Sequence, residues 1–133
     1  MKLLALYGLT AAGCFAIDFV WLTRIAQRFY QTHLGHLLRE EPVVWAAVAF
    51  YALYLVGVVA FAVLPGLEAG SLGRAAALGA LFGLVAYATF DLTSAALFRD
   101  FPVIVVVVDL AWGTVLTSGT ATIGYFAGRW LGL

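Results

Sequence analysis

Four long apolar stretches, separated by short polar or glycine-rich segments, account for most of the chain. Each stretch reaches the length of about 20 residues that an α-helix needs to cross the hydrocarbon core of a bilayer. The pattern therefore predicts an all-α, integral membrane four-helix bundle in which residues 1–133 form a single transmembrane domain. The predicted membrane helices cover residues 3–22, 43–64, 72–98 and 102–127.

Helix-breaking residues and short connections support these boundaries. Pro65-Gly66 is expected to end the second helix, and Pro102 suits the first turn of the fourth, where no N–H partner is lost. The short segment Arg99-Asp100-Phe101 makes the third and fourth helices antiparallel neighbours. Four spans also place both chain termini on one side of the membrane, and the count of Lys and Arg on the two sides does not decide orientation.

The connection between the first and second helices, residues 23–42, is the longest and has apolar residues at helical spacing. We expect an amphipathic segment lying in the membrane interface. A straight extension of the first helix beyond the lipid has the same periodicity, so that alternative stays open.

Composition narrows the possible classes of protein. The chain is 65% hydrophobic and 11% charged, whereas soluble domains are about 45–50% apolar and about 25% charged. Seven Lys and Arg balance seven Asp and Glu, so no basic surplus exists for nucleic acid. One cysteine, Cys14, excludes an internal disulfide and a Cys-based zinc site. A soluble enzyme, a disordered tail and a nucleic-acid binder are thereby excluded, and no phosphate-binding loop of an ATPase is present.

Three aspartates, Asp18, Asp91 and Asp109, lie inside apolar spans. A carboxylate there costs a few kcal/mol or more unless it is neutralised, paired or facing a polar cavity. At about 1.5 Å per residue, each lies roughly 9–10 Å from the membrane side opposite the termini. We therefore expect three carboxyl groups at one level, holding one or two protons at neutral pH.

Aromatic and hydroxyl side chains recur on the same helical faces as these aspartates. Trp21 and Trp112 each follow an aspartate by three residues, and Tyr87 precedes Asp91 by four, spacings that share a helix face. The sequence thus predicts a pocket that binds a ligand or accepts protons, with arginines around its mouth. The predicted pocket residues are Asp18, Asp91, Asp109, Trp21, Trp112, Tyr51, Tyr54, Tyr87, Thr93 and Ser94, and the predicted mouth residues are Arg24, Arg28 and Arg99.

Other polar and small residues have simpler interpretations. The aspartates would equally serve as hydrogen-bonding groups that hold the helices together. His33 and His36 are weak metal candidates, because such residues usually form the polar face of an interfacial helix, and we expect no metal and no cofactor. The pair Gly79-x-x-x-Gly83 is expected to pack inside the bundle, whereas Gly124-x-x-x-Gly128 would serve a dimer or another partner.

The motifs described above resemble those of the DUF2177 family of small bacterial predicted membrane proteins. The resemblance rests on the two Asp-x-x-Trp motifs, on Phe50-Tyr51-x-x-Tyr54 and on residues 87–93, Tyr-Ala-Thr-Phe-Asp-Leu-Thr. Ser94 departs from the asparagine that we associate with the next position. The resemblance implies a four-span protein of the bacterial inner membrane and no established activity. Some family members lie near genes for cyclopropane-type lipid modification, which favours a function related to lipids.

Three hypotheses of function follow. The first is a pocket that binds a polar or cationic group, in lipid binding or transport. The second is a small membrane enzyme that uses a protonated Asp for acid–base chemistry on a lipid or isoprenoid. The third is an accessory or assembly subunit of a larger membrane complex. Membrane lipid is the expected partner, together with a homo-oligomer or larger complex, and whether the protein is an enzyme stays open.

Overall fold

The computed structural model describes all 133 residues and contains helices and connecting turns but no strand. Its elements join into four continuous helices. The first is formed by α1 (Lys2–Trp21), the π-helical segment η1 (Leu22–Ala26) and α2 (Gln27–Leu34). The second is formed by α3 (Val44–Val58), the π-helical segment η2 (Val59–Val63) and α4 (Leu64–Ala69). The third and fourth are α5 (Leu72–Leu97) and α6 (Val103–Trp130).

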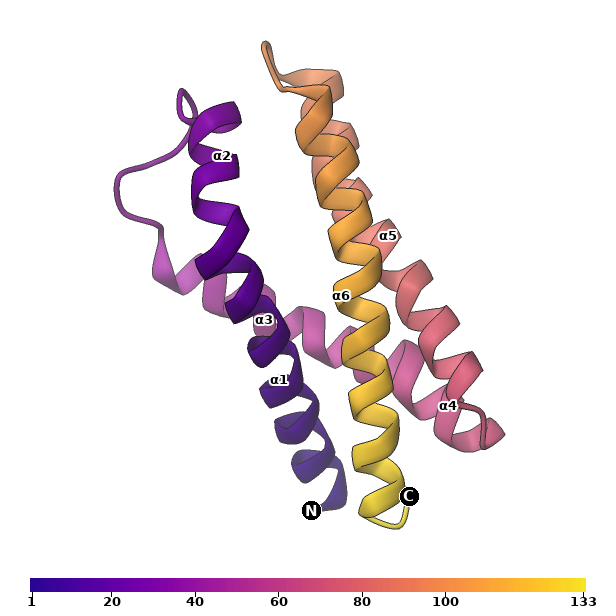
Figure 1. The fold of residues 1–133 in the computed structure, drawn as a ribbon. Helices are drawn as coiled ribbons and strands as arrows, with labels where there is room; N and C mark the ends of the chain where they lie inside the picture. The colour runs from indigo at the N-terminus through magenta and orange to yellow at the C-terminus, as the bar shows by residue number, and fades with distance from the viewer.

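All four helices are long and apolar enough to cross a membrane. Large apolar side chains cover the outside of the bundle: Trp45, Leu53 and Leu97 are 76%, 74% and 77% exposed. The interior combines an apolar core, which includes Leu6, Val58 and Leu116, with buried aspartate, threonine and tyrosine side chains. Both termini lie at the same end of the molecule (Figure 1). The structure thus confirms the expected all-α membrane bundle and its topology.

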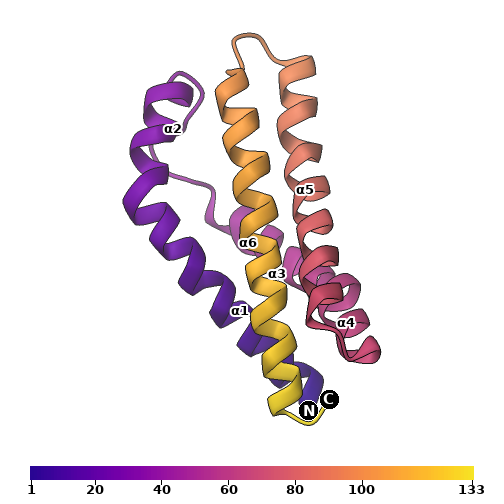
Figure 2. The same ribbon diagram turned by 45° about the vertical axis from the view of Figure 1, so that its right-hand side comes forward.

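The first helix does not stop at Leu22 but continues to Leu34. No glycine or proline interrupts the chain between Cys14 and Leu34, so nothing in the sequence breaks the helix before Gly35. Its last part, α2, leans away from α6, so the bundle is wider at this end than at the termini (Figure 2). Residues 23–34 of the segment expected in the interface are therefore a continuation of the first helix, which corresponds to the alternative arrangement, while residues 35–43 lie outside the helices.

The second helix also extends further than expected, since Pro65 and Gly66 lie inside it. A proline within a helix removes one backbone hydrogen bond and crowds the preceding turn. Here the wider π-helical turn of η2 comes directly before α4, and Pro65 is the second residue of α4. The helix ends instead at Gly70, whose φ of 61° is left-handed and reverses the chain.

α5 and α6 form an antiparallel hairpin that is closely packed from its turn to the middle of the bundle (Figure 2). Small residues allow the two backbones to approach: a Cβ on Gly79 would lie 2.7 Å from the Ala121 side chain. A Cβ on Gly83 would collide with the carbonyl oxygen of Gly113. The prediction that Gly79 and Gly83 pack inside the bundle is confirmed.

The other glycine pair, Gly124 and Gly128, was expected to face a partner, and that expectation is wrong. A Cβ on Gly124 would lie 2.6 Å from Val63, and one on Gly128 would collide with Leu67. Both glycines are buried and let the second helix cross close to α6. The same small-x-x-x-small spacing serves packing within a chain or between chains, so spacing alone does not tell which.

Candidate functional site

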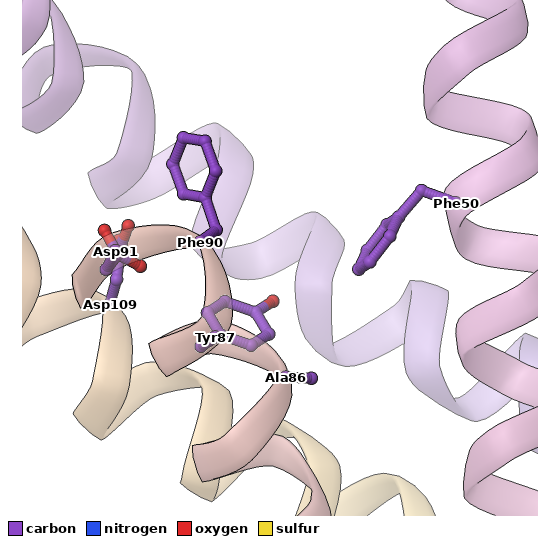
Figure 3. A pocket seen from close by; sticks show the side chains of 6 residues that line it. All are labelled: Phe50, Ala86, Tyr87, Phe90, Asp91 and Asp109. Carbon is purple, nitrogen blue, oxygen red and sulfur yellow. The ribbon is translucent and has the colours of Figure 1, made fainter. Parts of the chain in front are cut away.

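Two of the three aspartates, Asp91 and Asp109, meet at one end of the α5–α6 hairpin. Asp91 lies seven residues before Phe98 and Asp109 seven residues after Pro102, so the short turn brings them to the same level. Their side chains lie together, as Figure 3 shows. Asp91 is 1% exposed and Asp109 is 7% exposed. The two carboxyl groups therefore lie side by side in a part of the bundle that is almost closed to solvent.

Tyr30 of α2 completes this group and is not among the residues predicted from the sequence. Its hydroxyl donates a hydrogen bond to Oδ1 of Asp109. Oδ1 of Asp91, in contrast, is buried and has no hydrogen-bond partner. Tyr30 lies beyond the expected end of the first membrane helix. Its position on a helix face was therefore not compared with that of the aspartates. Asp109 thus has a fixed donor from the protein, while Asp91 keeps an unused acceptor.

A cavity of about 330 Å³ lies beside the two carboxyl groups. Its walls combine the aspartates with aromatic and small apolar side chains (Figure 3). Phe50 extends from α3 on the opposite side of the cavity from Tyr87. The lining residues are Phe50, Ala86, Tyr87, Phe90, Asp91 and Asp109. The cavity is therefore bordered by two carboxyl groups and by aromatic surfaces.

The structure places Asp18 away from this pair. Its Oδ2 accepts a hydrogen bond of 2.5 Å from Tyr51 of α3. The neighbouring Ile17 side chain lies against Gly119, which is ten residues, or about 15 Å, further along α6 than Asp109. The expected common level rested on a first helix ending near Arg24. Because that helix continues to Leu34, Asp18 lies deeper in the bundle, and only two carboxyl groups share a level.

The two tryptophans of the Asp-x-x-Trp motifs stack on each other and do not line the cavity. The rings of Trp21 and Trp112 are 4.6 Å apart with an interplanar angle of 11°. This contact joins α1 to α6 where the two helices begin to separate. Such aromatic pairs contribute about 0.5–1.5 kcal/mol beyond the burial of their surfaces. The motif thus connects two helices, a role that its spacing alone did not show.

The remaining predicted pocket residues are distributed over the bundle. Tyr54 and Thr117 share a hydrogen bond of 2.5 Å in the core. The Thr93 hydroxyl donates to the backbone carbonyl of Thr89 on the exposed side of α5, whereas Ser94 is buried. Of the expected pocket residues, then, Tyr87, Asp91 and Asp109 line the cavity.

The charged residues expected at the mouth lie elsewhere. Arg24 and Arg28 line a separate surface hollow, and Arg99 is exposed in the α5–α6 turn. The His33 ring stacks on Phe29 with 4.6 Å between the ring centroids, while His36 is exposed after α2. No group of three or more His, Cys, Asp or Glu side chains comes together in a geometry for a metal ion.

Comparison with known proteins agrees with this architecture. Residues 3–126 match the model of a family described as "Predicted membrane protein (DUF2177)". The match covers nearly the whole chain and confirms the resemblance carried by the helix motifs. No curated protein and no solved structure matches the chain.

Proposed function

The chain belongs to the DUF2177 family of predicted membrane proteins, and we propose that it binds a cationic amine group, carried by a membrane lipid, in the cavity beside Asp91 and Asp109. The binding serves recognition or transport of that lipid. From the resemblance to bacterial proteins, we also propose that the chain resides in the bacterial inner membrane.

The observation that supports the proposal is the unpaired Oδ1 of Asp91. Buried polar atoms in proteins nearly always have a hydrogen-bond partner, so an orphan oxygen on a residue that lines a cavity points to a missing one. Carboxyl oxygens accept hydrogen bonds and attract cations, so the partner that suits them is a hydrogen-bond donor with positive charge. An ammonium group fulfils both conditions.

The aromatic lining favours the same class of ligand. Phe50, Tyr87 and Phe90 present rings around the space beside the carboxyl pair. A cation over such a ring gains about 0.5–2 kcal/mol when water is excluded. The hydrocarbon part of an amphiphilic amine also fits this lining, whereas a hydrated metal ion would gain little from it.

The depth of the site supports a lipid as the carrier of the amine. Asp109 lies 20 residues, or about 30 Å, from Arg129 along α6. That distance equals the thickness of the hydrocarbon core of a bilayer. With Arg129 at one boundary, the carboxyl pair lies in the half of the bilayer nearer to the opposite headgroups.

Binding of dodecylamine by the purified protein in detergent micelles tests the proposal, with uncharged dodecanol as the matched probe. We expect dodecylamine to bind more tightly, and Asp91→Asn to weaken its binding about tenfold or more. The reason is that a charge-assisted hydrogen bond contributes roughly 1.5–3 kcal/mol. Isothermal titration calorimetry measures both affinities.

Asp100→Asn is the matched control, because Asp100 is an exposed aspartate in the α5–α6 turn. It removes the same charge and should leave the affinity for dodecylamine unchanged. Near-ultraviolet circular dichroism of the stacked tryptophans reports whether each variant keeps its fold. Equal affinities of the folded Asp91→Asn variant and the unmodified protein would contradict the proposal, as would equal binding of dodecanol and dodecylamine.

A further inference from the structure

A second polar site lies on the outer surface of the first helix, at the junction of η1 and α2. It is a hollow of about 380 Å³ lined by Thr23, Arg24, Gln27 and Arg28. All four residues are polar, and none is acidic. We infer that this hollow binds the phosphate group of an anionic phospholipid on the membrane side opposite the termini.

The hollow is separate from the cavity beside the aspartates. Arg24 and Arg28 are four residues apart and therefore lie on one helix face. Tyr30, which contacts Asp109, follows Arg28 by two residues, or about 200° around the helix. The arginines thus point outward on the face opposite the carboxyl pair, so the two sites hold different groups.

The position of the hollow along the helix corresponds to the phosphate level of a bilayer. From Lys2 to Arg24 the helix rises by about 33 Å over 22 residues. The hydrocarbon core is about 30 Å thick, so a cation at each end reaches a headgroup region. The side chains of Phe19, Val20 and Ile25 near Arg24 are 66%, 59% and 51% exposed, as expected where lipid chains surround the helix.

The charges of the hollow explain why an anion is needed there. Two guanidinium groups four residues apart on a helix repel each other, and no carboxylate in the hollow compensates them. A phosphate group placed between them accepts hydrogen bonds from both planar guanidinium forks. The exposed apolar neighbours favour a phosphate attached to acyl chains over a free phosphate ion, because the same molecule then covers both surfaces.

Native mass spectrometry with added phosphatidylglycerol tests this inference. We expect retained phosphatidylglycerol on the unmodified protein and a loss of about tenfold or more in the variant Arg24→Gln/Arg28→Gln. The control Arg39→Gln/Arg99→Gln removes the same net charge from exposed sites outside the hollow and should retain the lipid. Equal retention in the two double variants would overturn the inference.

Three further measurements keep the test decisive. Arg24→Lys/Arg28→Lys preserves charge and helix-forming residues but removes the bidentate forks, so we expect intermediate retention; full retention contradicts the forked contact. Inorganic phosphate should not displace phosphatidylglycerol, and displacement would assign the hollow to free phosphate instead. Asp91→Asn should retain phosphatidylglycerol fully, so failure of the amine proposal and failure of this inference give different results.

Discussion

Gly83→Ala is expected to destabilise the protein by about 1–3 kcal/mol, the range for an extra group forced into a packed core. The added methyl group would collide with the carbonyl oxygen of Gly113 and lie 2.6 Å from Cβ of Thr117. A backbone atom cannot move aside as a flexible side chain can, so α5 and α6 must separate. The carboxyl pair depends on this hairpin, and amine binding should be lost together with stability. Unfolding in detergent micelles, followed by circular dichroism, measures the change.

Gly8→Ala provides the matched control, because it makes the same chemical change in a different environment. A Cβ at position 8 meets no atom within 4 Å. Since glycine is a poor helix former, alanine there should stabilise the protein by roughly 0.5–1 kcal/mol. The two substitutions are therefore expected to have opposite signs. A Gly83→Ala variant as stable as the unmodified protein would show that the hairpin is looser than the structure indicates.

Tyr30→Phe is expected to release α2 from the rest of the bundle. α2 packs mainly against η1 of its own helix, and its hydrogen bond to Asp109 connects it to α6. A hydrogen bond to a charged group contributes roughly 1.5–3 kcal/mol. Its loss therefore raises the population of molecules in which α2 has moved away from α6 about tenfold or more. Hydrogen–deuterium exchange should then be about tenfold faster at the amides of residues 27–34.

Tyr7→Phe is the control for this prediction. It removes a tyrosine hydroxyl from the same helix, one that donates to the backbone carbonyl of Ala52 with 2.9 Å between the oxygens. Tyr7 lies near the termini, so exchange in α2 should remain unchanged. If the amides of α2 exchange at the same rate in the Tyr30→Phe and Tyr7→Phe variants, the hydrogen bond to Asp109 does not hold this segment in place.

The sequence correctly predicts the four helices and the meeting of Asp91 with Asp109, and both results have a physical reason. Apolar length determines which segments cross the lipid, and a very short turn determines the register of α5 against α6. Because Asp91 and Asp109 are equally far from that turn, their meeting follows from counting residues. No information about distant contacts is needed for such a hairpin.

Contacts between helices that are distant in sequence do not follow from counting residues. The level of Asp18 depended on where the first helix ends, and periodicity is identical for a continuing helix and for a new one. Tyr30 became part of the site only because the helix continues. The roles of Gly124 and of the stacked tryptophans depend on crossing angles, which the spacing of residues along one helix does not specify.

The π-helical segment η1 changes the direction in which the side chains after it point around the axis of the first helix. Asp18 and Tyr30 are twelve residues apart and would differ by about 120° in direction on a regular α-helix, yet both reach partners inside the bundle. A wider turn between them winds the chain less and brings the two faces back toward alignment. The number of residues between Asp18 and Tyr30 is therefore fixed by geometry: one residue more or fewer would present a different side chain to Asp109. A change of length in residues 35–43, outside the helices, would leave that pairing intact.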